Sequence, residues 1–409
     1  MDLSYSAEYE AFRKEVQTFV QENWTDEDRN SAPPPDPRSI TFGTLIRTDE
    51  RATKFRIKAA ERGYLYRHVP KRYGGGEQPF DPLKSTIISE ELRRSQAPGE
   101  LMGQGASMLV PTLVEHGTEE QKEKFVRDTL LGKIRWCQGY SEPGSGSDLA
   151  SLRTRGVLDG DFWVINGQKI WTSNADTSEW MFCLVRTEPE APKHEGISYL
   201  LIDMQTPGLT VRPLRQMTGE ADFNEVFFDN VRVPAKNIVG KRGQGWVVSR
   251  STLKHERALI GNSLLSRRTL DGVIMLAQAL NLRGQPAIKD PAIRNKIVEL
   301  ETKVLANEYH ANRLLTMQAR GEEAGIAGLV AKLYGTMLGY DVAKLAMDML
   351  GDRGMLAPGE PSAPAMGMFL TAYMWSLGVL IAGGTANIQR NVIAERGLGL
   401  PRDQAASRK

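Results

Sequence analysis

One acidic residue stands in an apolar stripe. Glu256 lies within residues 253–260 (LKHERALI), whose spacing predicts a helix that places Leu253, Ile260 and Leu264 on its own face. Burial among aliphatic side chains raises the pKa of a carboxyl group and excludes water, as a base that abstracts a weakly acidic carbon proton requires. An ion pair with an arginine is the more common reason for an isolated buried glutamate, so the pattern alone supports no catalytic role.

Small polar residues fill a second segment, residues 138–148 (QGYSEPGSGSD). A strand that ends in such residues exposes backbone N–H groups and hydroxyls, which suit a phosphate or a ring edged by oxygen and nitrogen. The segment lacks both the GxGxxG pattern of a dinucleotide fold and the lysine of a phosphate-binding loop. Gly/Ser turns of this kind are more often purely structural.

Two further segments could bind a cofactor, but each also has an ordinary structural explanation. Residues 167–173 (GQKIWTS) offer a tryptophan and hydroxyls to a flat cofactor, although tryptophan on a strand is more often core. Residues 382–390 (AGGTANIQR) place a glycine pair before a helix, whose N-terminus favours an anion such as a pyrophosphate. A plain loop-to-helix junction capped by Thr385 explains the same pattern.

Other chemistries have little support. The five histidines are scattered without ligand spacing, so no metal is expected, and no GxSxG elbow of a hydrolase occurs. Cys137 and Cys183 are the only cysteines, which excludes a disulfide scaffold and favours a reducing compartment. The 52 basic residues nearly balance the 50 acidic ones, so a nucleic-acid partner is not expected.

The periodicity of apolar residues divides the chain into three domains of an α+β fold. Helical spacing covers residues 1–133, short β runs cover 134–240, and helical spacing returns over 241–409 with breaks near 284–291 and 351–364. In the middle domain, turns at Asp159-Gly160 and Asn166-Gly167 predict an antiparallel sheet. Further strands are expected at residues 180–186, 197–203, 209–214 and 225–228, and a Pro-rich loop at 32–37.

The N-terminal residues lack the pattern of a signal or transit peptide. We find no stretch of about 18 apolar residues, so no membrane span is expected. A cytoplasmic enzyme is the simplest interpretation, and a chain trimmed of a presequence would look the same.

Four segments in this order resemble the acyl-CoA dehydrogenase family: residues 140–148, 167–173, 227–234 (FFDNVRVP) and 383–390. The resemblance covers essentially the whole chain. It implies an N-terminal helical domain, a middle β domain and a C-terminal four-helix bundle, in agreement with the periodicity. It also implies FAD as cofactor and the introduction of a 2,3 double bond into an acyl-CoA thioester during lipid β-oxidation.

The resemblance also implies roles for individual residues. The flavin ring would be lined by Gln138, Tyr140, Ser141, Trp171 and Ser173, and the FAD diphosphate would be approached by Thr385 and Asn387. Arg283 and Gln285 would reach the FAD of a neighbouring subunit, although residues 282–286 (LRGQP) depart from the family's Arg-x-x-Phe-Gly pattern. The acyl-CoA substrate would lie near Ser147, Arg257 and Ala382.

The position of the catalytic base departs from many members, which carry a glutamate where this chain has Gly383. A subset of the family instead has the base in a Leu-x-x-Glu-Arg context, which matches Leu253 to Arg257 and assigns the role to Glu256. In the implied mechanism Glu256 takes the α-proton and the β-hydride passes to flavin N5, while the backbone N–H of Gly383 supports the thioester oxygen. Small residues at 382 and 383 predict a wide pocket for branched, cyclic or bulky acyl groups.

The resemblance implies a homotetramer that passes electrons to an electron-transfer flavoprotein, and a heterotetramer is also compatible. Two other functions stay open at this point. One is a flavin-dependent oxidase or monooxygenase on the same scaffold, and the other is a non-catalytic partner subunit of a mixed dehydrogenase.

Overall fold

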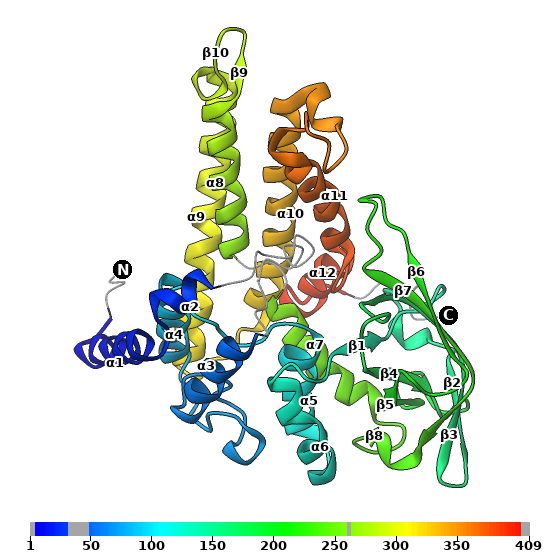
Figure 1. Ribbon diagram of the computed structural model, residues 1–409. Helices are drawn as coiled ribbons and strands as arrows, with labels where there is room; N and C mark the ends of the chain where they lie inside the picture. Colours follow the sequence, from blue (N-terminus) through cyan, green and yellow to red (C-terminus); the bar gives the residue numbers. More distant parts are fainter. Residues whose placement is uncertain (1–4, 32–48, 260–262, 402–409) are drawn as a thin grey trace. The chain divides into compact units, whose positions relative to one another are not determined.

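The computed structural model describes residues 5–31, 49–259 and 263–401, with the side chains of residues 256–259 outside this description. The Pro-rich loop expected at 32–37 lies outside it too. Internal contacts divide the chain into two compact units, Met1–His255 (unit 1) and Glu256–Lys409 (unit 2). The domain order predicted from periodicity, helices then sheet then helices, is confirmed (Figure 1).

Unit 1 begins with helices whose apolar residues recur at helical spacing. They are α1 (Ala7–Asn23), α2 (Asp26–Asn30), α3 (Glu50–Glu61), α4 (Pro82–Arg94), α5 (Val110–His116) and α6 (Glu119–Leu130). In α1, Val16 and Val20 are buried because residues four apart share a face. At the start of α6, Thr118 and Gln121 form a capping box that satisfies free N–H groups of the first turn.

The middle of unit 1 is a single sheet. Its strands are β1 (Trp136–Gly139), β2 (Arg155–Asp159), β3 (Phe162–Ser173), β4 (Trp180–Arg186), β5 (Ile197–Asp203), β6 (Leu209–Leu214), β7 (Phe223–Pro234) and β8 (Ile238–Val239). The strand order is β6-β7-β3-β2-β4-β5-β8, with β1 beside β4. The antiparallel prediction is wrong for β1, which runs parallel to β4, because the β2–β3 hairpin lies between them in the chain and serves as a crossover connection.

The turn predicted at Asn166-Gly167 is also wrong. Strand β3 continues through it, and its register against β7 slips by one residue between Ile165 and Gly167, which marks a β-bulge. Gly167 has a φ of 148°, and a Cβ at this position would lie 2.7 Å from the Cα of Thr154. The glycine therefore permits a close approach of β3 to Thr154, which directly precedes β2. The turn predicted at Asp159-Gly160 is present, and its two-residue loop is Gly160-Asp161, between the paired Asp159 and Phe162.

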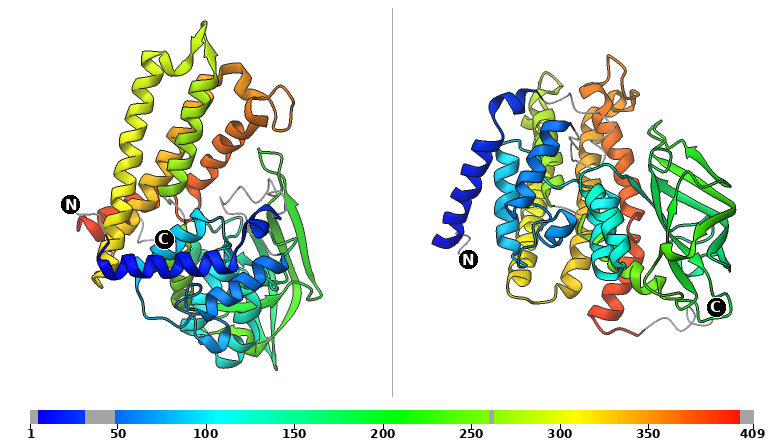
Figure 2. Two further views of the ribbon diagram at one scale, coloured as in Figure 1. Left: turned by 60° about the vertical axis from the view of Figure 1, so that its left-hand side comes forward. Right: turned by 60° about the horizontal axis from the view of Figure 1, so that its bottom comes forward.

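Helix α7 (Gly245–Leu259) crosses the boundary between the units, and four long helices form the body of unit 2. These are α8 (Ser263–Ala279), α9 (Pro291–Ala319), α10 (Gly325–Leu350) and α11 (Met368–Ile381), followed by the short α12 (Ala386–Val392). The small hairpin of β9 (Asn281–Leu282) and β10 (Gln285–Pro286) joins α8 to α9 (Figure 2). Buried aliphatic residues such as Leu270, Leu300 and Val342 bring α8, α9 and α10 into one core.

An apolar segment in unit 2 corrects the expectation that the chain has no stretch of about 18 apolar residues. Residues Pro364–Gly397 contain an 18-residue window that is apolar enough for a membrane span, and 6% of that window is buried. The continuous helix within it, α11, has only 14 residues. At 1.5 Å per residue it is about 21 Å long, whereas a spanning helix needs about 20 residues. The feature is therefore better described as a half-buried apolar helix than as a membrane span.

Candidate functional site

The loop after β1 and the middle of β3 lie side by side in unit 1. The backbone N–H of Ile170 donates a hydrogen bond to the carbonyl oxygen of Ser141 at 2.9 Å. This bond brings the predicted ligand segments 138–148 and 167–173 together. Ser141 and Ser173 are half-buried, so their hydroxyls belong to neither the core nor the open surface.

Trp171 is held outward by a second bulge in β3. The register against β7 slips between Lys169 and Thr172, and Trp171 lies in the bulge with a φ of 59°. Its side chain is 59% exposed and contacts Phe223 edge-on, with ring centroids 6.0 Å apart. A left-handed backbone at a bulky residue costs free energy and persists where the surrounding structure enforces it, often at functional sites. The explanation of Trp171 as plain core is excluded.

Tyr140 differs from its expected role. Its ring is buried and packs edge-on against the rings of Phe182 and Tyr199. The side chain is thus part of the core beneath the loop, and its ring is not an exposed lining surface. Gln138, two residues earlier, is half-buried.

Two buried oxygens next to Trp171 lack hydrogen-bond donors among the described residues. They are Oγ1 of Thr172 and Oδ1 of Asn224, which are paired in register across β3 and β7. An unsatisfied buried polar atom costs about 1–3 kcal/mol, so such a pair favours a bound group that supplies N–H or O–H donors. A flavin ring and its ribityl chain carry donors of this kind, and the residues present therefore fit the group.

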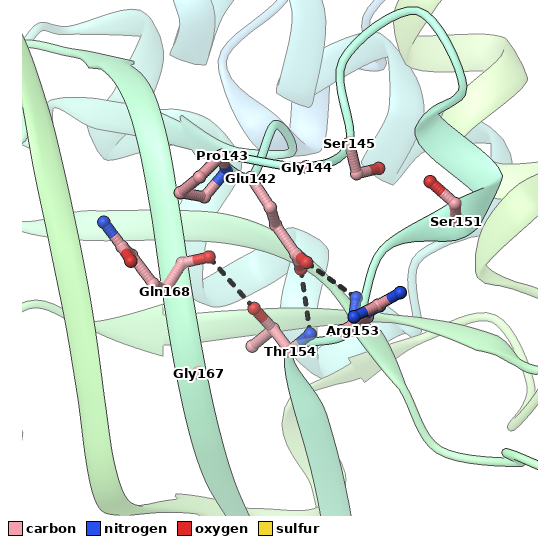
Figure 3. A pocket seen from close by; sticks show the side chains of 9 residues that line it. All are labelled: Glu142, Pro143, Gly144, Ser145, Ser151, Arg153, Thr154, Gly167 and Gln168. Atoms are coloured by element: carbon pink, nitrogen blue, oxygen red, sulfur yellow. Dashed lines mark hydrogen bonds between the residues drawn. The ribbon is translucent and has the colours of Figure 1, made fainter.

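A cavity of about 340 Å³ lies beneath the loop of residues 142–145 (Figure 3). Its lining includes Ser145, Ser151, Arg153 and Gln168. Ser147, predicted to lie near the CoA end of the substrate, is exposed on the same loop.

A shallower depression of about 620 Å³ shares Ser151 and Arg153 with this cavity and adds the cations Arg155, Arg186 and Lys193. The guanidinium group of Arg186 donates hydrogen bonds to the carbonyl oxygens of Ala150 and Lys193, at 2.6 and 2.8 Å. Arg153 and Arg155 are exposed, and no ion pair involves them among the described residues.

In unit 2, the loop before α12 has a defined shape. Gly383 and Gly384 have φ values of 59° and 96°, in the left-handed region that favours glycine. Thr385 caps α12, its hydroxyl accepting a hydrogen bond from the N–H of Ile388, so the capping explanation is confirmed. Two polar side chains hold the loop from inside: Lys332 binds the carbonyl oxygen of Gly384 at 2.8 Å, and Gln389 binds that of Gly383 at 3.2 Å.

Arg283 and Gln285 lie apart from this loop. Both are exposed on the β9–β10 hairpin, at the end of α8 and α9 away from α12 (Figures 1 and 2). Within a single copy of unit 2, the structure therefore does not bring Arg283 and Gln285 together with Thr385 and Asn387. Such an arrangement is compatible with the prediction that they serve a neighbouring subunit.

The middle of α7 is anchored to α5 by polar contacts within unit 1. The hydroxyls of Thr112 and Thr252 lie 3.0 Å apart, and Nε2 of His116 lies 2.8 Å from the hydroxyl of Ser251. These bonds fix the helix turn that precedes Glu256.

Glu256 and Arg257 both fall on α7, as predicted, but their side chains lie outside the described residues. Of the expected apolar stripe, Leu253 is half-buried and Leu264 is exposed. The assignment of Glu256 as the base accordingly stays a prediction.

Sequence reasoning missed Lys169 and Lys332, two fully buried lysines that hold these loops. Lys169 stood inside a segment already singled out, and its inward direction depends on the bulges of β3. For Lys332 the available signal was a cation in the first part of α10, residues 325–340, which has no other charged residue.

Comparisons with known proteins establish the family. Models of the acyl-CoA dehydrogenase N-terminal, middle and C-terminal domains match residues 6–133, 137–231 and 243–398. The chain therefore belongs to the acyl-CoA dehydrogenase family. It is an acyl-CoA dehydrogenase by class, and members of this family typically bind FAD.

Among curated relatives, acyl-CoA dehydrogenase IpdE1 of Mycobacterium tuberculosis is 40% identical over 87% of this chain and 89% of that protein. FadE34 of the same organism is 38% identical over 85% of this chain, which spans 46% of FadE34. Two solved structures, each 29% identical, resemble it over 98% of its length and 100% of theirs. They are the ChsE4-ChsE5 complex from Mycobacterium tuberculosis, with a TM-score of 0.76, and the Tcur3481-Tcur3483 steroid ACAD, with a TM-score of 0.77.

Proposed function

We propose that this protein carries out the FAD-dependent 2,3-dehydrogenation of a bulky, ring-bearing acyl-CoA. The observation that carries the flavin assignment is the outward bulge at Trp171, set against the Ser141 loop and beside the unsatisfied oxygens of Thr172 and Asn224. Together they place an exposed aromatic face above two buried, unsatisfied hydrogen-bond acceptors in one region of unit 1. The flavin, when bound there, supplies a two-electron acceptor.

Glu256 serves as the base that takes the α-proton. A carboxylate cannot remove so weakly acidic a proton unless the enolate-like transition state is stabilised by several kcal/mol. The Gly383 loop suits this task, because Lys332 and Gln389 occupy the carbonyl oxygens of Gly384 and Gly383 and hold the loop's backbone in place. The backbone N–H of Gly383 then donates to the thioester oxygen.

The proposed size of the acyl group rests on Ala382 and Gly383, which have little side-chain volume. A left-handed φ of 59° at Gly383 also disfavours the glutamate that many family members carry there. The steroid ACAD among the similar structures gives independent support for a ring-bearing substrate.

The CoA end would use the cationic depression beside Ser147. Arg153 and Arg155 are exposed and form no ion pair among the described residues. Guanidinium groups bind phosphate oxygens through paired, charge-assisted hydrogen bonds, so the nucleotide phosphates of CoA fit this surface.

Assembly into a tetramer would cover α11, which has one fully buried residue among its 14. Most of its other residues are half-buried, and apolar surface that a chain leaves partly uncovered often marks an interface between chains. The ChsE4-ChsE5 relative is a complex of two different chains. A homotetramer and a heterotetramer with a second dehydrogenase-like chain are both compatible, and an electron-transfer flavoprotein would take the electrons.

The test is anaerobic mixing of the purified, FAD-loaded protein with straight-chain and steroid-ring acyl-CoAs, followed by flavin absorbance. Rapid bleaching with ring-bearing thioesters is expected. Preference for the straight chain would contradict the wide pocket, and bleaching by neither would point to a missing partner chain. Rapid oxygen consumption by the reduced protein would favour the oxidase alternative.

A further inference from the structure

A buried ion pair joins the two segments that meet at the Trp171 bulge. Lys169 is fully buried, and its Nζ lies 2.8 Å from Oε1 of Glu142. The same ammonium donates to the carbonyl oxygen of Tyr140 at 3.0 Å. One side chain of β3 therefore binds both a backbone atom and a carboxylate of the loop that contains Ser141.

Glu142 extends the connection to the two residues that directly precede β2. Its Oε2 accepts the backbone N–H of Arg153 at 2.6 Å, and its Oε1 accepts that of Thr154 at 2.9 Å (Figure 3). Burial acts to raise the pKa of Glu142, but the Lys169 ammonium and the N–H of Arg153 outweigh it, so the pKa lies below its ordinary value. The carboxylate is therefore charged at neutral pH and has three donors.

Such a pair is a costly way to stabilise a fold. Two buried charges lose their hydration, and replacing a buried pair with neutral groups of similar shape is often neutral or stabilising. Charge-assisted hydrogen bonds are short and directional, so they fix geometry more strictly than apolar packing does. Lys169 stands two residues before Trp171, and Glu142 stands one residue after Ser141.

We propose that the Lys169–Glu142 pair is a positioning device, which sets the Ser141 loop against the Trp171 bulge and thereby shapes the surface that receives the flavin ring. The inference rests on the proposed FAD function and deepens it. Neither residue contacts the cofactor in this account: both act through the backbone of residues 140–142 and the strand beneath Trp171.

The test is a double variant, Lys169→Met/Glu142→Gln, which removes both charges and leaves no unpaired ion in the core. The FAD affinity of the apoprotein is measured by fluorescence titration, and the visible absorbance and circular dichroism of the bound flavin are recorded. We expect FAD to bind at least tenfold more weakly, with an altered visible spectrum, while the melting temperature of the apoprotein stays close to the parent's. Flavin reduction should slow with little change in the KM for acyl-CoA.

A matched control removes a surface pair from the same sheet. Arg232 and Asp159 lie 2.8 Å apart on exposed parts of β7 and β2. Arg232→Met/Asp159→Asn should leave the FAD affinity and the flavin spectrum unchanged. An equal loss of FAD affinity in this control would show that removing any ion pair from the sheet weakens FAD binding.

If the core double variant fails to fold, the isosteric Glu142→Gln protein provides the second measurement. It keeps the shape of the side chain but leaves the buried Lys169 ammonium without a carboxylate, so weaker FAD binding of at least the same size is expected. Parental FAD affinity and spectrum, in the double variant or in a folded Glu142→Gln protein, would overturn the positioning role. A parent protein that binds no FAD would instead refute the proposed function, so the two failures are distinguishable.

Discussion

The ammonium of Lys332 lies 2.8 Å from the carbonyl oxygen of Gly384, in the interior of unit 2. Together with the bond from Gln389 to Gly383, this contact fixes both peptide groups that precede Thr385. The loop is thus held by hydrogen bonds to its backbone carbonyl oxygens. We infer that loop geometry, more than any side chain at 382–384, is what this segment contributes.

Gly384→Ala should therefore destabilise the protein. The left-handed φ costs about 1–2 kcal/mol for a residue with a Cβ, and this Cβ would lie 2.7 Å from Nε2 of Gln389. Urea denaturation should show a free energy of unfolding lower by about 2 kcal/mol, with slower flavin reduction. Gly272→Ala in α8 is the control, because its Cβ would meet open space; a gain of about 0.5–1 kcal/mol is expected there. Equal effects at both positions would refute the argument.

The backbone at Trp171 predicts that a glycine substitution leaves the protein more stable than an alanine substitution does, the reverse of the usual order in a strand. Glycine in a strand is ordinarily less stable than alanine by about 0.5–1 kcal/mol. At a φ of 59°, alanine is strained and glycine is not. In urea denaturation, the free energy of unfolding of the Trp171→Gly apoprotein should consequently be about 1 kcal/mol higher than that of Trp171→Ala. The ordinary order would mean that the bulge does not hold this residue in the left-handed region.

Acid stability should depend on Glu142. Its pKa is lower in the folded protein than the ordinary 4.5 of an unfolded chain. Between these two values the unfolded state binds more protons, so this part of the stability is present above pH 4.5 and is lost as the pH falls below it. Thermal melts from pH 6 to 3 should show a steeper decline for the parent than for Lys169→Met/Glu142→Gln. If the melting temperatures of the two proteins fell equally with pH, the lowered pKa of Glu142 would be contradicted.

Arg153→Ala should weaken binding of the CoA nucleotide. Loss of a charge-assisted bond of about 1.5 kcal/mol predicts a KM for acyl-CoA that is about tenfold higher, with kcat almost unchanged. For the corresponding acyl-pantetheine, which lacks the nucleotide phosphates, parent and variant should have the same KM. An equal rise with both substrates would show that Arg153 does not contact the phosphates.

Much of the fold could be predicted because apolar periodicity reports which face of an element is buried. The strands expected at 180–186, 197–203 and 209–214 have those bounds in the structure. The exception is β3, where two bulges shift the alternation of side chains, so sequence parity could not show that Lys169 points inward and Trp171 outward. A turn dipeptide, Asn166-Gly167, was mistaken for a chain reversal because a bulge uses the same residues.

The candidate site was predicted as segments rather than as contacts. Ser141 and Trp171 were singled out by residue type, but the hydrogen bond that brings their segments together joins residues 29 apart and depends on tertiary structure. Local patterns also could not show that the ring of Tyr140 is buried or that Lys332 binds the Gly384 carbonyl. Such details depend on how distant elements pack.

The most direct test of the account is a single-turnover comparison of the parent with Glu256→Gln, mixed anaerobically with a ring-bearing acyl-CoA. Both proteins should bind FAD with equal affinity, since Glu256 is not assigned to the cofactor. The account predicts that flavin bleaching in the variant slows by at least a thousandfold, about 4 kcal/mol in the barrier. Bleaching at the parental rate by a variant that retains FAD would contradict Glu256 as the base.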